Sequence, residues 1–164
     1  MSAQRKSPDL ERPRLYAKYL TAICSNIWTM TAKLLSASGY QGDAMNLPVT
    51  DVDSAELFYV EKMGFTVVER SDDPIKRAVL ERDGVKMALA ENGGDSEQDG
   101  CAFPTDDVVA LRDEFVGNGL AGIGTINDET GDDGSKYKVF FVVAPDGLCY
   151  WFGESITGDG GTQA

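Results

Sequence analysis

The chain contains no histidine among its 164 residues, and this absence excludes much of the chemistry that a protein of this size could perform. Without imidazole there is no Ser–His or Cys–His nucleophile pair, so proton transfer would fall to carboxylates, lysine or tyrosine. Cysteine is also scarce. The three present, Cys24, Cys101 and Cys149, have no Cys-x-x-Cys spacing, which argues against a disulfide framework or a zinc knuckle. We therefore expect a reducing, cytoplasmic environment.

Long apolar runs and positive charge are scarce as well. No stretch of 18 apolar residues is free of charge, so we expect no membrane span. The net charge is −12; residues 1–42 carry six basic and two acidic side chains, and the rest carries nine and 25. Such an acidic body repels phosphate backbones, so nucleic acid is not an expected partner. Because there is no apolar span, a membrane is not an expected partner either. The charge could attract a cationic ligand or serve only as a solubility coat.

One pattern occurs twice in the chain. The string LPVTDV at 47–52 and the string FPTDDV at 103–108 are each followed by a helical run that ends in glycine, at Gly64 and Gly119. A strand, an acidic cap, a helix and a glycine in the same order predict a duplicated module. Two similar halves in turn favour a ligand cavity between them.

Residues 1–43 differ in composition from the rest, and we predict a poorly specified basic N-terminal extension there. A helix over 15–36 is one expectation. The segment contains arginine and serine and is poor in acids, which is typical of a transit peptide. Alternatively, the natural start lies later, at Met30 or Met45. The extension therefore plays no part in the fold prediction.

The predicted domain covers residues 44–155, with one half at 44–91, the other at 100–155, a polar linker at 91–100 between them and a flexible tail at 156–164. Periodicity and turn residues predict the order β-α-β-β-β in each half. In the first half the helix is capped by Asp51 or Asp53, and the strands are 45–49, 65–70, 77–82 and 85–90. In the second half the helix at 108–116 is capped by Asp106 or Asp107, and the strands are 101–105, 121–126, 137–143 and 148–152, with an acidic loop at 127–135. The fold class is α+β.

Alternation along the strands predicts which side chains face the helices. The helix-facing set is Met45, Leu47, Val49, Val85, Met87, Leu89, Tyr150 and Phe152. The set expected on the opposite, concave side is Ala44, Asn46, Pro48, Lys86, Ala88, Cys149, Trp151 and Gly153.

Four segments in order, LPVTDVDSAELFYVEKMGF, ERDGVKMALAE, AFPTDDVVALRDEF and FFVVAPDGLCYWFGE, resemble the vicinal oxygen chelate superfamily. This superfamily includes glyoxalase I, extradiol dioxygenases and bleomycin-resistance proteins. The resemblance covers residues 44–154 and implies two βαβββ modules that form a cupped mixed sheet around a ligand site. It also implies a homodimer, which often completes that site.

The chain departs from the metal-dependent members of this superfamily at the positions of their ligands. Those positions correspond here to Ala44, Ala88, Gly100 and Trp151, none of which can bind a divalent ion. The resemblance therefore points to the bleomycin-resistance-like branch, with no catalytic residue, no metal and no cofactor. It implies a protein that sequesters a small molecule, cationic and aromatic, as in antibiotic resistance. The alternatives are a metal-dependent lyase or dioxygenase that uses carboxylates, and an interaction module that has lost its ligand.

The predicted ligand-binding residues are Trp151, Asn46, Met87, Phe141 and Lys86. The indole of Trp151 would stack on the ligand or make a cation–π contact worth about 0.5–2 kcal/mol, or else it merely fills the cavity. Lys86 fits a cationic ligand only if its ammonium group reaches the rim. Glu154 is the one carboxylate considered near the mouth of the cup, and a charged strand end is its favoured interpretation.

Overall fold

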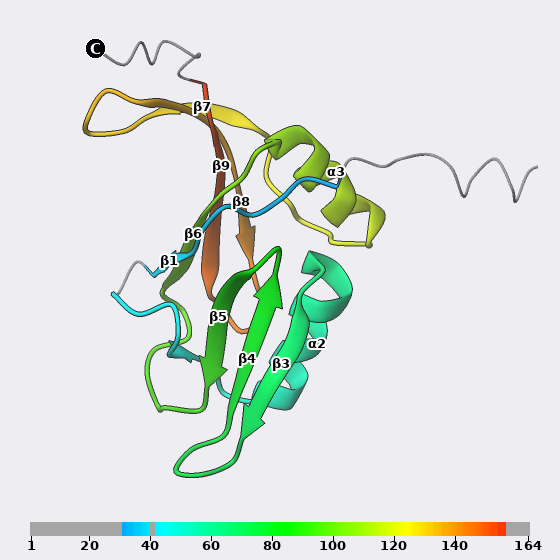
Figure 1. Cartoon of the computed structure of the whole chain (residues 1–164), viewed down its shortest axis with the longest axis vertical. Helices are drawn as coiled ribbons and strands as arrows, with labels where there is room; N and C mark the ends of the chain where they lie inside the picture. Colours follow the sequence, from blue (N-terminus) through cyan, green and yellow to red (C-terminus); the bar gives the residue numbers. More distant parts are fainter. Residues whose placement is uncertain (1–30, 40–41, 157–164) are drawn as a thin grey trace, which may run out of the picture. The chain divides into compact units, whose positions relative to one another are not determined.

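The computed structural model describes residues 31–39 and 42–156, which form two sheets with one helix each (Figure 1). The elements are β1 (Ser38–Gly39), β2 (Leu47–Pro48), α2 (Val52–Met63), β3 (Thr66–Ser71), β4 (Arg77–Arg82), β5 (Val85–Ala90), β6 (Asp99–Pro104), α3 (Val108–Gly117), β7 (Asn127–Thr130), β8 (Lys136–Val143) and β9 (Cys149–Ser155). Within the described ranges, no helix is long and apolar enough to cross a membrane.

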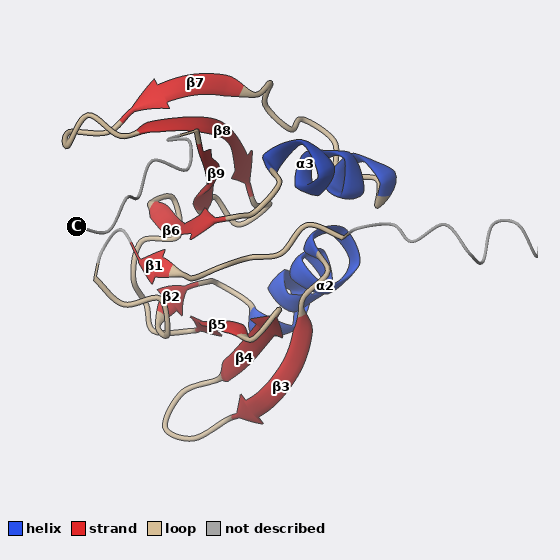
Figure 2. Cartoon of the chain, turned by 45° about the horizontal axis from the view of Figure 1, so that its top comes forward, coloured by secondary structure: helices blue, strands red, loops and turns tan. Residues whose placement is uncertain are grey.

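Both halves have the same sheet topology. The first half orders its strands β2-β5-β4-β3, and the second orders them β6-β9-β8-β7 with β1 added on the open edge of β6. In each half the first strand runs parallel to the last, and the other neighbours are antiparallel. Figure 2 shows the two four-strand arrangements with their helices. The predicted α+β class and the two βαβββ modules are confirmed.

Each helix begins at an aspartate that follows the first strand of its half. Asp51 accepts hydrogen bonds from the backbone N–H groups of Asp53 and Ser54, and Asp107 accepts one from Ala110. Both cap residues are extended, as an N-cap requires. Of the two caps considered for each helix, the structure therefore selects Asp51 and Asp107.

A second carboxylate supports each helix start, and it lies in or directly after the last strand of the same half. Glu91 accepts the backbone N–H of Val52 at 3.0 Å, and Glu154 accepts that of Val108 at 3.0 Å. Each acid satisfies one of the helical N–H groups that has no partner within the helix. The repeat thus extends from sequence to hydrogen bonding.

The core lies on the helix side of the sheets and joins both halves in one cluster. Phe103, Phe115, Phe140 and Phe152 form a network of stacked and edge-on rings, with centroid separations of 5.1 to 6.0 Å. The predicted helix-facing residues Leu47, Val49, Val85, Met87, Leu89, Tyr150 and Phe152 all belong to this cluster.

Alternation fails at the start of the first strand. Met45 is half-buried outside the core cluster, whereas Ala44, expected on the concave side, packs against that cluster. The cause is local: residues 44–46 form a turn, and the strand begins only at Leu47. An alternation rule applies only where the backbone is extended.

The strand expected at 121–126 is wrong. That segment is irregular, and the strand forms instead at Asn127–Thr130, within the predicted acidic loop. All four residues of β7 are exposed and polar, so no apolar alternation marks them. Backbone pairing with the first residues of the long strand β8 makes β7 a strand, and composition does not reveal that pairing.

Residues 31–39, which the sequence assigned to the N-terminal extension, pair with the second half, and we name them the strap. Leu34 bridges Thr105, and β1 pairs antiparallel with β6, so that in Figure 2 β1 is seen between β6 and β2. Residues 31–36 are not helical; residues 15–30 of the expected helix lie outside the described part of the chain. The strap covers an edge that β6 would otherwise expose.

One buried guanidinium connects the strap, both helices and the first sheet. Arg82, only 8% exposed at the end of β4, donates to the carbonyls of Met63 at 2.6 Å and Ala32 at 3.1 Å. It also donates to the carboxylates of Glu114 at 2.8 Å and Asp83 at 3.2 Å. A buried charge is tolerated when its donors are satisfied in this way.

Replacing Arg82 should destabilise the whole chain. Arg82→Ala leaves two buried carbonyls and a half-buried carboxylate without their donor, and we expect it to lower the free energy of unfolding by about 2–4 kcal/mol. Arg82→Lys should recover only part of this loss, because one ammonium cannot reach four acceptors on separate segments. Urea unfolding followed by circular dichroism measures both. Arg70→Ala, which breaks an exposed ion pair with Glu56, is the control and should have little effect; equal losses for the two alanine variants would contradict the assignment.

Candidate functional site

The candidate site is the face of the second sheet that α3 does not cover. Phe140 and Phe152 point to the helix, so their neighbours in the strands point the other way. Phe141 pairs with Trp151 across β8 and β9, and Tyr137 lies further along β8 on the same face. The side chain of Phe141 is 39% exposed, which leaves its ring available to a ligand. The result is an open aromatic surface.

The indole of Trp151 lies along its own strand over a bare glycine. A Cβ built on Gly153 would lie 2.0 Å from Cη2 of the indole and 2.4 Å from Cζ2, closer than any atom can approach. Val139, opposite Gly153 on β8, has no exposed surface although it is outside the helix-side core. Gly153 therefore allows the indole to lie flat on the sheet and shield Val139.

Two further contacts hold the indole in this orientation. Its Nε1–H donates to Oε2 of Glu129 on β7 at 3.2 Å, and its ring meets Tyr137 edge-on at a centroid separation of 5.6 Å. Glu129 forms no ion pair with any described residue, so its negative charge is not neutralised locally. An aromatic face beside an unpaired carboxylate is an arrangement suited to a cation.

The five predicted ligand-binding residues are only partly brought together. Trp151 and Phe141 are cross-strand neighbours on the face just described. Lys86 is exposed on the other sheet, 3.5 Å from Glu81, and Asn46 is exposed beside β2, where it accepts a hydrogen bond from Asn92. Met87 has no exposed surface and lies in the helix-side core, so it cannot contact a ligand on the free face. Strand alternation correctly assigned Met87 to the helix-side core. The prediction that Met87 also lines the ligand site does not agree with that position.

The free face of the first sheet differs from that of the second. Ala88 and Ala90 on β5 have no exposed surface, and Arg77 extends its guanidinium to the carbonyl of Met45. Small side chains and a hydrogen-bonded arginine replace the aromatic rings of the second sheet. Only the second sheet therefore carries an open aromatic surface among the described residues.

The fold changes the interpretation of three carboxylates. Glu154 lies in β9 and caps α3, so it belongs to the helix side of the sheet and not to the aromatic face. This agrees better with the favoured interpretation, a charged strand end, than with a position at the mouth of the cup. Its twin Glu91 was missed, although both acids follow a turn glycine by seven residues, Gly84 and Gly147. Glu129 was missed because β7 was not predicted, and only β7 places it beside Trp151.

Within residues 31–39 and 42–156, no three His, Cys, Asp or Glu side chains are grouped as metal ligands would be. Cys101 is buried, and burial raises its pKa to about 12, so it carries no thiolate at neutral pH. Since the thiolate is the nucleophile, this cysteine is a structural residue.

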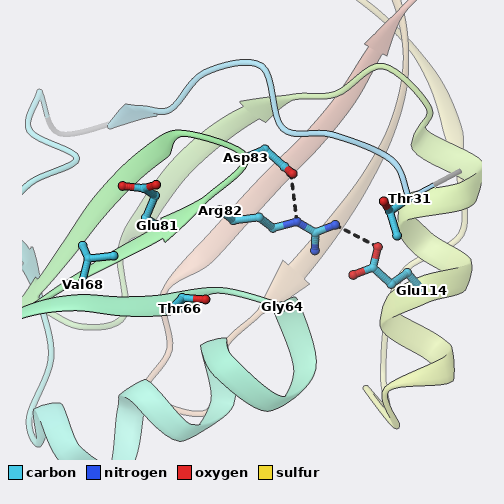
Figure 3. A pocket seen from close by; sticks show the side chains of 8 residues that line it. All are labelled: Thr31, Gly64, Thr66, Val68, Glu81, Arg82, Asp83 and Glu114. Carbon is cyan, nitrogen blue, oxygen red and sulfur yellow. Dashed lines mark hydrogen bonds and ion pairs between the residues drawn. The ribbon is translucent and has the colours of Figure 1, made fainter.

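An open cavity of about 470 Å³ lies beside the Arg82 guanidinium and its partners (Figure 3). It is lined by Thr31, Gly64, Thr66, Val68, Glu81, Arg82, Asp83 and Glu114. The guanidinium donates to Asp83 and Glu114, and Glu81 pairs with Lys86, so its charged groups already have partners. We assign this cavity a structural role.

The chain belongs to the Glyoxalase/Bleomycin resistance protein/Dioxygenase superfamily, whose family model matches residues 42–152. No curated protein sequence is similar enough to count as a relative. Among solved structures, the fold is similar to that of a bleomycin resistance determinant encoded on the transposon Tn5, at 23% identity, a TM-score of 0.52, and coverage of 67% of this chain and 93% of that one.

Two other structures share this fold. One is an antibiotic-binding protein from a Streptomyces species, at 20% identity and a TM-score of 0.55, which covers 68% of this chain and 92% of that one. The other is a glyoxalase/bleomycin resistance protein/dioxygenase from Alicyclobacillus acidocaldarius, at 19% identity and a TM-score of 0.56, with coverage of 68% and 89%. Residues 31–39, the strap, precede the matched region.

Replacing Gly153 should displace the indole. In a Trp28→Phe background, where Trp151 is the only tryptophan, Gly153→Ala should shift the fluorescence emission to the red, because its methyl group occupies the position of the ring. Overpacking of this kind should also cost about 1–3 kcal/mol of stability. Gly117→Ala, which meets no atom within 4 Å, is the control. An unchanged spectrum for Gly153→Ala would contradict the flat orientation of the ring.

Proposed function

We propose that this protein is a metal-free binding protein that sequesters a small molecule with cationic and aromatic groups. The observation that carries the proposal is the flat indole of Trp151, which lies beside Phe141 and donates to the unpaired carboxylate of Glu129. Rings supply stacking area and the carboxylate supplies charge. We further propose that it acts as a cytoplasmic homodimer, in which a second copy completes the site.

The composition of the site supports binding over catalysis. Trp151 and Ala88 stand where the resemblance places metal ligands of the catalytic members, and neither can donate to a metal. The net charge of −12 favours encounter with cations over a long range. The similar structures include a bleomycin resistance determinant and an antibiotic-binding protein, which supports an antibiotic as the class of ligand.

A binding titration tests the proposal with bleomycin and spermine as probes. We expect at least one of the two to raise the melting temperature of the wild type and to quench Trp151 in the Trp28→Phe background. Trp151→Ala should weaken binding about 3- to 30-fold, because the cation–π and stacking contact is lost. Glu129→Gln keeps an acceptor for the indole but removes the charge, and should weaken binding about 2- to 5-fold.

The matched control is Asp113→Asn, which removes the same charge from an exposed position on α3. It should bind as the wild type does. If Glu129→Gln and Asp113→Asn weaken binding equally, the weakening is caused by the change in net charge alone and Glu129 has no specific role. Absence of stabilisation by either probe in a confirmed dimer, or a stoichiometric metal retained after dialysis, would contradict the proposal.

A further inference from the structure

A second cavity, of about 190 Å³, lies between the start of α2 and the turn that joins β8 to β9. It is lined by Thr50, Asp51, Ser54, Ala55, Tyr59, Pro145 and Asp146, and we name it the α2 pocket. None of these residues belongs to the aromatic face around Trp151. The α2 pocket is therefore separate from the candidate ligand site.

The α2 pocket contains an acceptor that has no donor. Oδ1 of Asp146 accepts the backbone N–H of Leu148, but Oδ2 is buried and has no hydrogen-bond partner among the described residues. Burial raises the pKa of this carboxyl above its usual range, and the Leu148 N–H and, to a smaller extent, the Tyr59 hydroxyl offset part of the rise. The Tyr59 hydroxyl also shares a hydrogen bond with that of Tyr150, at 2.8 Å. Buried polar atoms are nearly always satisfied, so an unpartnered oxygen points to a donor that enters the pocket.

The repeat identifies the kind of donor. Asp146 and Gly147 of the β8–β9 turn correspond to Asp83 and Gly84 of the β4–β5 turn, one half earlier. In that turn, Oδ2 of Asp83 accepts the backbone N–H of Leu34 in the strap, at 3.0 Å. The oxygen of Asp83 thus accepts from a peptide N–H and from the Arg82 guanidinium. The β8–β9 turn is one residue longer and has no arginine, so a peptide N–H is the donor that remains.

The strap fills the space that corresponds to the α2 pocket. Ala32 and Leu34 are 3% and 2% exposed there, against α3 and the β4–β5 turn. Its backbone bonds the end of β6: Leu35 N–H donates to the Pro104 carbonyl at 2.8 Å, and the Lys33 carbonyl accepts from Asp106 N–H at 3.2 Å. An extended segment with a buried aliphatic side chain therefore fits such a site.

The first half offers the matching backbone groups. The repeat aligns Pro48 with Pro104 and Thr50 with Asp106, so the Pro48 carbonyl and the Thr50 N–H correspond to the groups that bond the strap. Among the described strands, β2 pairs only with β5, and its other edge has no partner. A strand edge, an aliphatic cavity and an orphan acceptor are the elements of recognition by strand addition.

We propose that the α2 pocket and the open edge of β2 form a docking groove for an extended peptide segment of a partner protein. The segment adds a short strand to β2, inserts an aliphatic side chain beside Tyr59 and donates a backbone N–H to Oδ2 of Asp146. In the strand register, Ala144 stands where Arg82 stands in the other half, so the contact from the guanidinium to the Ala32 carbonyl of the strap has no counterpart. The groove therefore binds its segment more weakly than the chain holds its own strap, as suits an exchangeable partner.

The strap sequence itself is the appropriate probe, because it fits the corresponding site. A fluorescein-labelled, amidated peptide TAKLLSASG (residues 31–39) should bind the full chain saturably in fluorescence anisotropy. Asp146→Asn keeps the oxygen that accepts from Leu148 and puts an amide NH2, a donor, in the place of Oδ2, and it should weaken binding about tenfold. Ala55→Leu fills the cavity and should abolish binding. Circular dichroism melts establish that both variants fold.

Two controls test whether binding is specific to this groove. Asp132→Asn removes an exposed charge elsewhere and should leave binding unchanged. A peptide with Leu34→Pro lacks the N–H and should bind at least tenfold more weakly. Absence of saturable binding would overturn the proposal. Binding that Asp146→Asn does not change would also overturn it, because that result is expected if the peptide merely displaces the chain's own strap. Release of monomers from a dimer by the peptide would also overturn it and assign the groove to the strap of a second copy.

Discussion

The arrangement of the described chain depends on the guanidinium of Arg82. It lies at the point where the first sheet, the end of α2, the second helix and the strap come together, and it donates to an acceptor on each. Its charge also lies 5.7 Å from the centroid of the Phe115 ring. Only a planar cation with several fixed donors satisfies acceptors in so many directions at once. The two halves and the strap are connected by this group as well as by their shared apolar core.

The two halves share a backbone but use it differently. Both cap their helices with an aspartate and with a glutamate that lies in or directly after the last strand, so the starts of α2 and α3 are built alike. They diverge at the turn beside the opposite helix, where one half has Arg82 and the other has Ala144 at the same register. The arginine accompanies an edge covered by the strap, and the alanine accompanies an edge of β2 that has no partner among the described strands. Divergence after duplication thus affects edges and faces more than the core.

The free faces follow the same logic. The free face of the first sheet carries small alanines and a hydrogen-bonded arginine, so it offers no ring on which an aromatic ligand can stack. Placing a glycine two residues after a tryptophan lets the indole lie flat, as in the second sheet. Glu129 then supplies the charge that orients the ring and has no cationic partner among the described residues. The binding surface thus depends on Gly153, which has no side chain to displace the indole, and on β7, a strand with no apolar residues.

The sequence by itself determined the repeat, the two helices with their aspartate caps, most strands and the helix-side core, because periodicity and turn chemistry are local properties. Alternation also predicted that Trp151 faces away from the helices, and Trp151 lies outside the helix-side core. The sequence could not reveal β7, whose four polar residues become a strand only by pairing with β8. Tertiary structure decided the contacts made at a distance along the chain: Glu129 beside Trp151, Met87 in the core, the strap on β6 and the unpartnered oxygen of Asp146. Those depend on which backbone groups meet, and pairing between distant segments leaves no trace in composition or alternation.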